Sequence, residues 1–374
     1  MKTGKIWAVS GLLFGTVLLA GQTLQAQETK EKVTVDNVDR TFFVRLPKGY
    51  DAKQHYPVVI LLAGMNQDPD DIERLTQFDP TADKNGIIAV YPAALHGTWN
   101  IGVHAEEEHQ MSPFPRRRRY GYPGGGGYPG GGGYPGGGGY PGGGQQSPND
   151  PNNPNNPNNP NNPNRPSEDH RAAEVDDIGF FNQMLDSLGT KFSIDNSRIY
   201  AAGLSDGGFM SFRLGCALSD RIAAVGAVAA DMPKKMICVP SRPVPVVMIN
   251  GTSDPVVPYN GGSDHSLQIS VLSAEDSAKD WAKIDRCGEK PEKSKLPASG
   301  KGATETKVDT FTGCQQNAAV VLYSLKGAGD TWPGGEQFEP ENSVGKVAQD
   351  VNANDLLWNF LQAQKLENKN APSQ

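Results

Sequence analysis

The sequence predicts an α/β fold in which helices cover both faces of a mostly parallel β-sheet. Several short runs are continuously apolar, which is typical of strands that are buried on both faces of a sheet. Other segments carry apolar residues at spacings of three and four, which is the pattern of an amphipathic helix. The two kinds of segment alternate along the chain, and this alternation favours parallel strands joined by helices.

The first elements precede residue 100. Two strands with alternating polarity are expected at 32–38 and 40–46. Two buried strands are expected at 57–62 and 86–91, with a short helix at 70–78 between them.

The later elements follow residue 170. A helix is expected at 174–188, because its apolar residues fall on one face. The remaining elements are expected as strand 198–202, helix 207–218, strand 223–229, strand 244–250, helix 267–283, strand 318–325 and helix 347–366. One domain over residues 27–374 accounts for all of them.

The N-terminus has the pattern of a secretory signal peptide. Lys2 and Lys5 precede an apolar run at 6–20, and small or polar residues follow up to Ala26. The alternative is an uncleaved anchor, which the shortness of the run disfavours. We therefore predict a signal peptide at 1–26 and a secreted protein, extracellular or periplasmic. No later apolar run is long enough to span a membrane, so an integral membrane span after signal removal is not expected.

A low-complexity segment interrupts the predicted domain. Gly (44) and Pro (29) form nearly a fifth of the 374 residues, against about 12% in average proteins. Four Tyr-Pro-glycine repeats begin at Tyr122, Tyr128, Tyr134 and Tyr140, and a Pro-Asn-Asn repeat covers 151–163. Such segments carry too little apolar surface to offset the entropy of ordering, so we predict a disordered insertion at 105–172.

Charge and cysteine usage exclude several functions. The net charge of −7 argues against a nucleic-acid partner. The four cysteines show no CxxC spacing, and no ligand spacing implies a metal. In an oxidising compartment three disulfide connectivities are open, and we expect the sequential one, Cys216 with Cys238 and Cys287 with Cys314. The alternative is four buried thiols.

The most specific motif is Gly-Leu-Ser-Asp-Gly-Gly at 203–208, which fits G-x-S-x-G. It lies directly between a predicted strand and a predicted helix, where a tight turn would present Ser205 Oγ above the carboxyl edge of the sheet. The amide of Asp206 would then point at a developing oxyanion. Ser205 is thus a candidate nucleophile, and the alternative is an ordinary glycine-rich turn.

A catalytic triad on such a fold runs Ser, acid, His along the chain. Asp254 follows the strand that ends at Asn250 and is the candidate acid, although a simple turn Asp is the alternative. A histidine is expected after strand 318–325, and none follows residue 265. The six histidines are His55, His96, His104, His109, His170 and His265.

Together these motifs resemble the secreted poly(3-hydroxybutyrate) depolymerase and feruloyl or acetylxylan esterase group of α/β-hydrolases. The resemblance rests on residues 203–210, 250–259 and 327–335. Gly-Thr-Trp-Asn at 97–100, Val-Asp-Asp-Ile at 175–178 and the final helix with Trp358 add to it.

The resemblance implies an α/β-hydrolase fold, an ester substrate, and acyl transfer without a cofactor. It implies Ser205 as nucleophile, Asp254 as acid, and Trp99 and Trp332 as substrate-binding residues. In the family motif Gly-Gly-Gly-His-Thr-Trp-Pro-Gly the histidine is the general base, whereas residues 327–334 place Asp330 there.

A second departure lies beside the expected oxyanion hole. Residues 62–64 read Leu-Ala-Gly where the family usually shows Leu-His-Gly. The amide of Met65 is still the candidate for the second oxyanion donor.

The replacement by Asp330 predicts weak catalysis. A carboxylate with a pKa near 4 is a poorer base than imidazole with a pKa near 6.5, and repulsion by Asp254 raises one of the two pKa values. Losing the base of such a triad costs on the order of 10⁶ in kcat. Among substitute bases, His265 is the best placed by sequence, with His104 and His109 next.

Two functions follow. The first is a serine esterase with an impaired base, acting on carboxylic esters that include polymers such as polyesters or plant cell-wall esters. The alternative is a catalytically inactive α/β-hydrolase that binds a polymer or surface.

Overall fold

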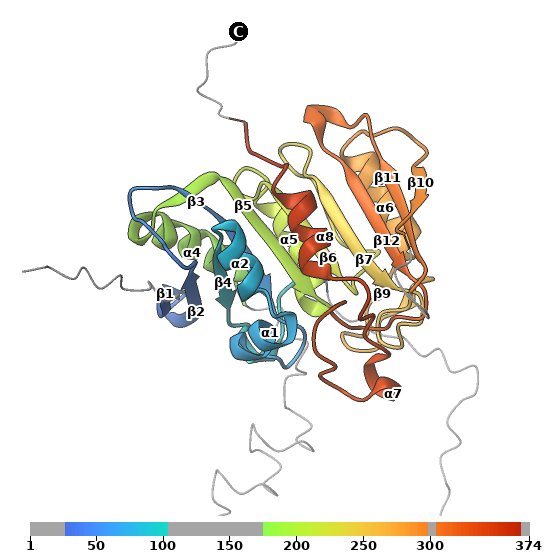
Figure 1. Ribbon diagram of the computed structural model, residues 1–374, viewed down its shortest axis with the longest axis horizontal. Coiled ribbons are helices and arrows are strands. Elements are labelled where there is room, and N and C mark those ends of the chain that lie inside the picture. Colours follow the sequence, from blue (N-terminus) through green and yellow to red (C-terminus); the bar gives the residue numbers. More distant parts are fainter. Residues whose placement is uncertain (1–26, 104–174, 298–303, 368–374) are drawn as a thin grey trace, which may run out of the picture.

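The computed structural model describes residues 27–103, 175–297 and 304–367. Their centre is a sheet of ten strands in the order β1-β2-β4-β3-β5-β6-β7-β12-β11-β10 (Figure 1). The predicted signal peptide at 1–26 and the predicted insertion at 105–172 lie outside the described residues.

The middle of the sheet is parallel and its two edges are antiparallel, as predicted for a mostly parallel sheet. The parallel strands are β4 (Ile88–Pro92), β3 (Tyr56–Leu62), β5 (Ile194–Leu204), β6 (Ala224–Val228), β7 (Val246–Gly251) and β12 (Val320–Leu325). The antiparallel strands are β1 (Gln27–Val35) and β2 (Val38–Leu46) at one edge and β11 (Thr306–Phe311) and β10 (Glu292–Lys295) at the other.

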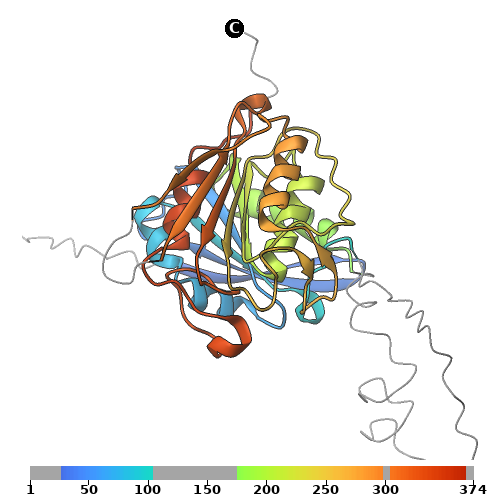
Figure 2. The same ribbon diagram turned by 90° about the vertical axis from the view of Figure 1, so that its right-hand side faces the viewer.

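Helices cover both faces, which Figures 1 and 2 show from two directions. One hydrophobic core lies under α4 (Asp177–Lys191), α5 (Asp206–Ala217) and α6 (Ala274–Ile284). The second lies under α1 (Pro69–Thr76), α2 (Asp79–Asn85) and α8 (Ala353–Leu361). None of the helices in the described ranges is long and apolar enough to cross a membrane.

Several predicted boundaries were wrong. The helix expected at 267–283 begins at Ala274, where the Ser273 side chain accepts a hydrogen bond from Asp276 N. The residues before it form the pair β8 (Gly262–Ser263) and β9 (Ser270–Val271). The helix expected at 347–366 also begins later than expected, because the Asn352 side chain caps its N-terminus.

Other elements were missed because their sequences lack apolar periodicity. They are β10, β11, α2, α7 (Glu341–Val344), η1 (Leu95–Gly97) and η2 (Gln315–Asn317). All four residues of β10 are exposed at the sheet edge, so no hydrophobic pattern marks that strand.

Both predicted disulfides are present, Cys216–Cys238 and Cys287–Cys314. The two ends of the predicted insertion are joined by hydrogen bonds within the domain. Asn100 Nδ2 donates to the Val175 carbonyl (2.7 Å) and Asn100 N to Asp177 Oδ2 (2.7 Å). Asp177 in turn pairs with the buried Arg40 at 2.5 Å, so the chain re-enters the fold beside its point of exit.

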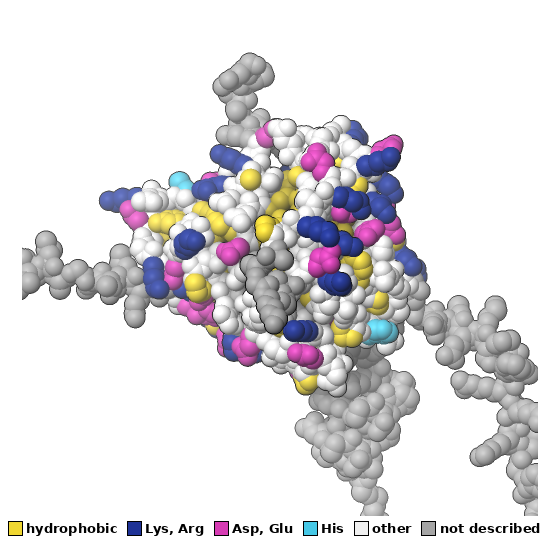
Figure 3. Space-filling model, turned by 45° about the vertical axis from the view of Figure 1, so that its right-hand side comes forward, with side chains coloured by type: hydrophobic (Ala, Val, Ile, Leu, Met, Phe, Trp, Pro, Cys, Tyr) yellow, Lys and Arg dark blue, Asp and Glu magenta, His cyan; other side chains and the backbone are white. Residues whose placement is uncertain are grey.

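The surface carries charges of both signs. On the face seen in Figure 3, Lys and Arg side chains are interspersed with Asp and Glu. This face therefore shows no broad patch of one sign.

Candidate active site

The turn between β5 and α5 is a strained elbow. Ser205 has φ 53° and ψ −115°, a conformation that is costly for any residue with a side chain. A Cβ on Gly207 would lie 2.1 Å from the Leu62 carbonyl oxygen, and one on Gly203 would lie 2.3 Å from Gly207. Only glycine fits at these two positions, which is why the G-x-S-x-G pattern gives this turn.

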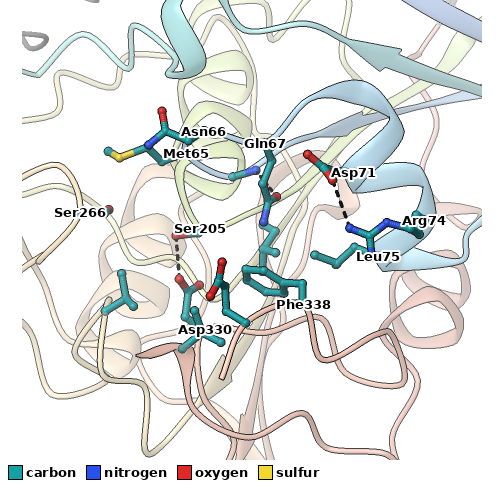
Figure 4. A pocket seen from close by; sticks show the side chains of 15 residues that line it. Met65, Asn66, Gln67, Asp71, Arg74, Leu75, Ser205, Ser266, Asp330 and Phe338 are labelled. Atoms are coloured by element: carbon teal, nitrogen blue, oxygen red, sulfur yellow. Dashed lines mark hydrogen bonds and ion pairs between the residues drawn. The ribbon is translucent and has the colours of Figure 1, made fainter. Parts of the chain in front are cut away.

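The elbow brings Ser205 to Asp330. Ser205 Oγ donates a hydrogen bond to Asp330 Oδ2 at 3.1 Å (Figure 4). Both side chains are buried, with 6% and 5% exposed, and both line a cavity of about 540 Å³. The turn after β12 fixes Asp330, whose amide donates to the Val344 carbonyl at 2.6 Å. The residue that the resemblance puts at the base position therefore lies within hydrogen-bond distance of Ser205.

Asp254 lies at the neighbouring strand end. A Cβ on Gly251 would lie 2.2 Å from the Ala328 carbonyl, so the ends of β7 and β12 touch. Asp254 Oδ1 accepts from the amides of Val256 and Val257, at 2.8 Å each. Its carboxyl is therefore held by its own turn.

The two carboxyls perturb each other. Burial raises the pKa of Asp254 to about 7. Burial, followed by the nearby charge of Asp254, raises the pKa of Asp330 well above the ordinary value, and the Ser205 hydrogen bond opposes this only in part. The Asp330 carboxyl therefore keeps its proton to higher pH than an ordinary aspartic acid does.

The amides of Asp206 and Met65 are the predicted oxyanion donors. Asp206 N is the first amide of α5, and first-turn amides have no acceptor within their helix. Met65 lies in the turn after β3 and lines the same cavity as Ser205 (Figure 4). Asn66 N donates to the Gly97 carbonyl at 2.7 Å and so anchors this turn.

The Asp206 side chain has a structural role that the sequence did not predict. Asp206 Oδ2 accepts from Thr98 Oγ1 (2.9 Å) and from Trp99 N (3.0 Å). Trp99 Nε1 donates to the Ala63 carbonyl at 3.0 Å, beside Met65. Asp206 thereby ties the elbow to the turn that carries the second amide. The sequence did hold a signal for this role. It was a carboxylate inside the elbow motif, together with the Gly-Thr-Trp-Asn motif elsewhere in the chain.

Trp99 and Trp332, which the resemblance implies as substrate-binding residues, lie away from the cavity surface. Their side chains are 1% and 0% exposed, and neither lines the cavity. Trp332 Nε1 donates to Asn354 Oδ1 at 2.9 Å, which joins the Asp330 turn to α8. Both indole rings are packed in the protein interior behind the cavity, because an apolar ring is more stable out of water.

No substitute histidine reaches Ser205 within the described residues. The His265 side chain is exposed, although its amide donates to the Val256 carbonyl at the cavity wall (3.0 Å). His55 and His96 are exposed elsewhere, while His104, His109 and His170 lie outside the described residues. Within 27–103, 175–297 and 304–367 no His, Cys, Asp and Glu side chains are grouped to hold a metal ion.

Comparison with known proteins gives partial matches. No family model matches the chain. Feruloyl esterase B of Piromyces equi is 34% identical over 163 residues, which cover 42% of this chain and 29% of that protein. Feruloyl esterase C of Emericella nidulans is 25% identical over 189 residues, covering 50% of this chain and 58% of that protein. The matched part of the chain thus spans 29% of the length of the first relative and 58% of the length of the second.

Some solved structures align with the chain at low sequence identity. An acetyl xylan esterase from Aspergillus awamori aligns with a TM-score of 0.48 at 10% identity, over 89% of this chain and 99% of that one. A ferulic acid esterase from Anaeromyces mucronatus aligns with a TM-score of 0.44 at 16% identity, over 91% and 90%. The described sheet has the strand directions and elbow of an α/β-hydrolase, and the sequence matches confirm the predicted resemblance of this chain to feruloyl esterases.

Proposed function

We propose that the protein is a serine-type hydrolase of carboxylic esters that works with a carboxylate in place of the histidine base. The observation that carries this proposal is the 3.1 Å hydrogen bond from Ser205 Oγ to Asp330 Oδ2, at the wall of the cavity. The strained backbone of Ser205 supports a nucleophile there, because strain is kept where function needs it.

The chemistry needs ionised Asp330. Its Oδ2 takes the Ser205 proton while Oγ attacks the ester carbonyl carbon, and the amides of Asp206 and Met65 stabilise the oxyanion. The C–O bond then breaks, and the leaving alcohol takes the proton back from Asp330. Water repeats the two steps on the acyl-Ser205 ester. The raised pKa of Asp330 makes its carboxylate a stronger base than an ordinary one, but leaves less of it ionised at neutral pH.

The substrate and the compartment belong to the proposal as well. The sequence relatives are named feruloyl esterases, which favours an aromatic or polysaccharide-linked ester. Two disulfides favour an oxidising compartment, in agreement with secretion by the predicted signal peptide.

The test is hydrolysis of p-nitrophenyl butyrate and methyl ferulate by wild type and by Ser205→Ala, with Ser211→Ala as the matched control. Ser211 is a buried serine on α5 whose hydroxyl donates to the Gly207 carbonyl, so it controls for a lost hydroxyl in the same helix. We expect slow hydrolysis in wild type and in Ser211→Ala, and none above background in Ser205→Ala. Equal rates in wild type and Ser205→Ala would refute the proposal.

A second candidate is a non-catalytic binding protein. It is favoured by the burial of Asp330 beside Asp254, which raises the pKa of Asp330 well above its ordinary value, since a protonated acid cannot accept the Ser205 proton. Wild type would then bind methyl ferulate or a polyester film as tightly as Ser205→Ala does and turn over neither.

A further inference from the structure

The segment at 336–347 forms part of the cavity wall. Phe338, Glu339 and Val344 of this segment line the same cavity as Ser205 (Figure 4). The segment contains α7, a helix of four residues without a side-chain hydrogen bond at its N-cap. Helices of this length are not stable by themselves, so contacts outside the helix must fix the shape of the segment.

The side chain of Gln337 supplies such contacts. Its Nε2 donates hydrogen bonds to the carbonyls of Glu339 (2.8 Å) and Gly345 (2.9 Å), and its Oε1 accepts one from Val347 N (3.0 Å). One side-chain amide, with two N–H donors and an acceptor, therefore joins the residues before α7 to those after it. Gln337 itself is exposed and does not line the cavity.

The end of this segment also fixes the turn that carries Asp330. Asp330 N donates to the Val344 carbonyl at 2.6 Å, and Val344 directly precedes Gly345, whose carbonyl is bound by Gln337. A Cβ on Gly329 would lie 2.1 Å from the same Val344 oxygen. The segment and the Asp330 turn are thus in direct backbone contact, so a displacement of one moves the other.

The start of the segment is fixed separately, on α1. Glu336 N donates to the Leu75 carbonyl at 3.0 Å, and the Glu336 carboxylate pairs with Arg74 at 2.7 Å. These bonds do not involve Gln337. Without the Gln337 side chain the segment would stay attached at its start, whereas residues 337–347 would lose the contacts that join their two ends.

From these contacts we infer that Gln337 is a positioning residue for Asp330. It holds the Val344 carbonyl in place, and that carbonyl holds the Asp330 turn so that the carboxyl stays within hydrogen-bond distance of Ser205. The inference rests on the proposed function only for the role of Asp330 as base, because the positioning itself needs no turnover.

The first measurement is amide hydrogen exchange by NMR in Gln337→Met, which keeps the length of the side chain and removes its three hydrogen bonds. The Asp330 and Gly329 amides both donate to carbonyls of the segment, so we expect them to exchange at least about tenfold faster. The Ser205 amide, which donates to the Val228 carbonyl at 2.9 Å, is the internal reference. Its exchange should change by less than about twofold.

Gln364→Met is the matched control. It is the same replacement in a glutamine whose Nε2 donates to the Phe360 carbonyl of α8 at 3.2 Å. It should leave the exchange of the Asp330 amide within about twofold of wild type. Thermal unfolding checks that both variants are folded.

The second measurement is the hydrolysis of p-nitrophenyl butyrate. In an active wild type, Gln337→Met should lower kcat about tenfold and change KM much less, because a misplaced base slows the chemical step. Gln364→Met should keep kcat within about twofold of wild type. A loss confined to KM would make Gln337 a support of the cavity wall alone and overturn the inference.

The exchange result decides the positioning even if nothing is hydrolysed. Faster exchange at Gly345 and Val347 but not at Asp330 in Gln337→Met would show that the side chain supports only its own segment, and this would overturn the inference. An equal increase at Asp330 in Gln364→Met would overturn it as well. A wild type without activity contradicts the proposed function, whereas faster exchange at Asp330 in that protein still supports the positioning.

Discussion

The elbow around Ser205 and the turn around Asp330 face each other across one hydrogen bond, yet they differ in how their sequences relate to function. The elbow follows the G-x-S-x-G pattern, and steric contact enforces it at Gly203 and Gly207. The Asp330 turn keeps its backbone, fixed by the Val344 carbonyl and by Trp332, while its key side chain is an acid. Both turns thus have a fixed backbone, whereas only the Asp330 turn departs in its key residue from the motif of the family that the sequence resembles.

The largest expected effect comes from restoring the base. Asp330→His places an imidazole between Ser205 and Asp254, where it can accept the serine proton and be oriented by the acid. General-base catalysis contributes about 10²- to 10⁴-fold, so kcat for p-nitrophenyl butyrate should rise by at least about 10². Adding Asp254→Asn to this variant should remove most of the gain. An unchanged rate in Asp330→His would contradict the idea that the two turns together form a catalytic site.

A second prediction concerns the elbow itself. Gly207→Ala places a methyl group 2.1 Å from the Leu62 carbonyl and should cost about 3 kcal/mol or more of folding free energy. Gly189→Ala is the matched control, because its Cβ would meet nothing closer than 3.8 Å and alanine favours a helix by up to about 1 kcal/mol. Chemical denaturation of both variants measures the difference, and equal stabilities would contradict the steric argument.

The link between the two oxyanion turns gives a third prediction. Asp206→Ala removes the acceptor of Thr98 Oγ1 and Trp99 N, so the turn with Met65 loses its tie to the elbow. In the active Asp330→His background we expect kcat to fall about tenfold with little change in KM, since an oxyanion donor acts mainly in the transition state. Asp206→Asn should retain most of the rate. A rise in KM alone would assign Asp206 to substrate binding instead.

A fourth prediction concerns how the reaction rate and the stability of the fold depend on pH. The wild-type base works only when ionised, and the pKa of Asp330 is raised, so the rate should keep rising with pH above neutrality. Stability should change in the opposite direction. A carboxyl whose pKa is higher in the folded than in the unfolded state binds more protons when folded, so raising the pH above the unfolded value destabilises the fold.

Asp330→Asn checks both trends. It should flatten the pH profile of stability and abolish the alkaline rise in rate. The pKa values of Asp231, Asp254, Asp264 and Asp206 are also raised by burial, so a residual slope in stability is expected. A wild-type rate that peaks below pH 6 would contradict the assignment of Asp330 as base.

The smallest effect is expected from excising residues 104–174. Asn100 and Val175 are already joined by a hydrogen bond of 2.7 Å, so a short Gly-Ser linker can bridge the two ends. Loop length changes closure entropy slowly, and the unfolding temperature should shift by only a few degrees. Asp177→Ala in the same deletion should instead destabilise strongly, since it leaves the buried Arg40 unpaired. A large loss from the excision alone would show that the segment stabilises the domain.

Much of the fold was predictable because apolar runs and glycine steric limits are local properties. The runs that form β3, β6 and β7 mark buried strands by themselves. Elements at the sheet edge were not predictable, since β10 is polar and exists only because β11 offers it a partner. The helix starts at Ala274 and Ala353 were also misplaced, because capping by Ser273 and Asn352 overrides the apolar spacing upstream.

The sequence by itself predicted that Ser205 lies on an elbow, and it favoured the sequential pair of disulfides among three possible connectivities. Asp330 came to the family's histidine position through the resemblance alone. Only the tertiary structure decided that Trp99 and Trp332 are buried, that Asp206 links two turns, and that Asp254 and Asp330, far apart in the sequence, lie close enough to interact. The physical reason is that burial and electrostatic coupling depend on distance in space, and parallel strands bring the ends of distant segments together.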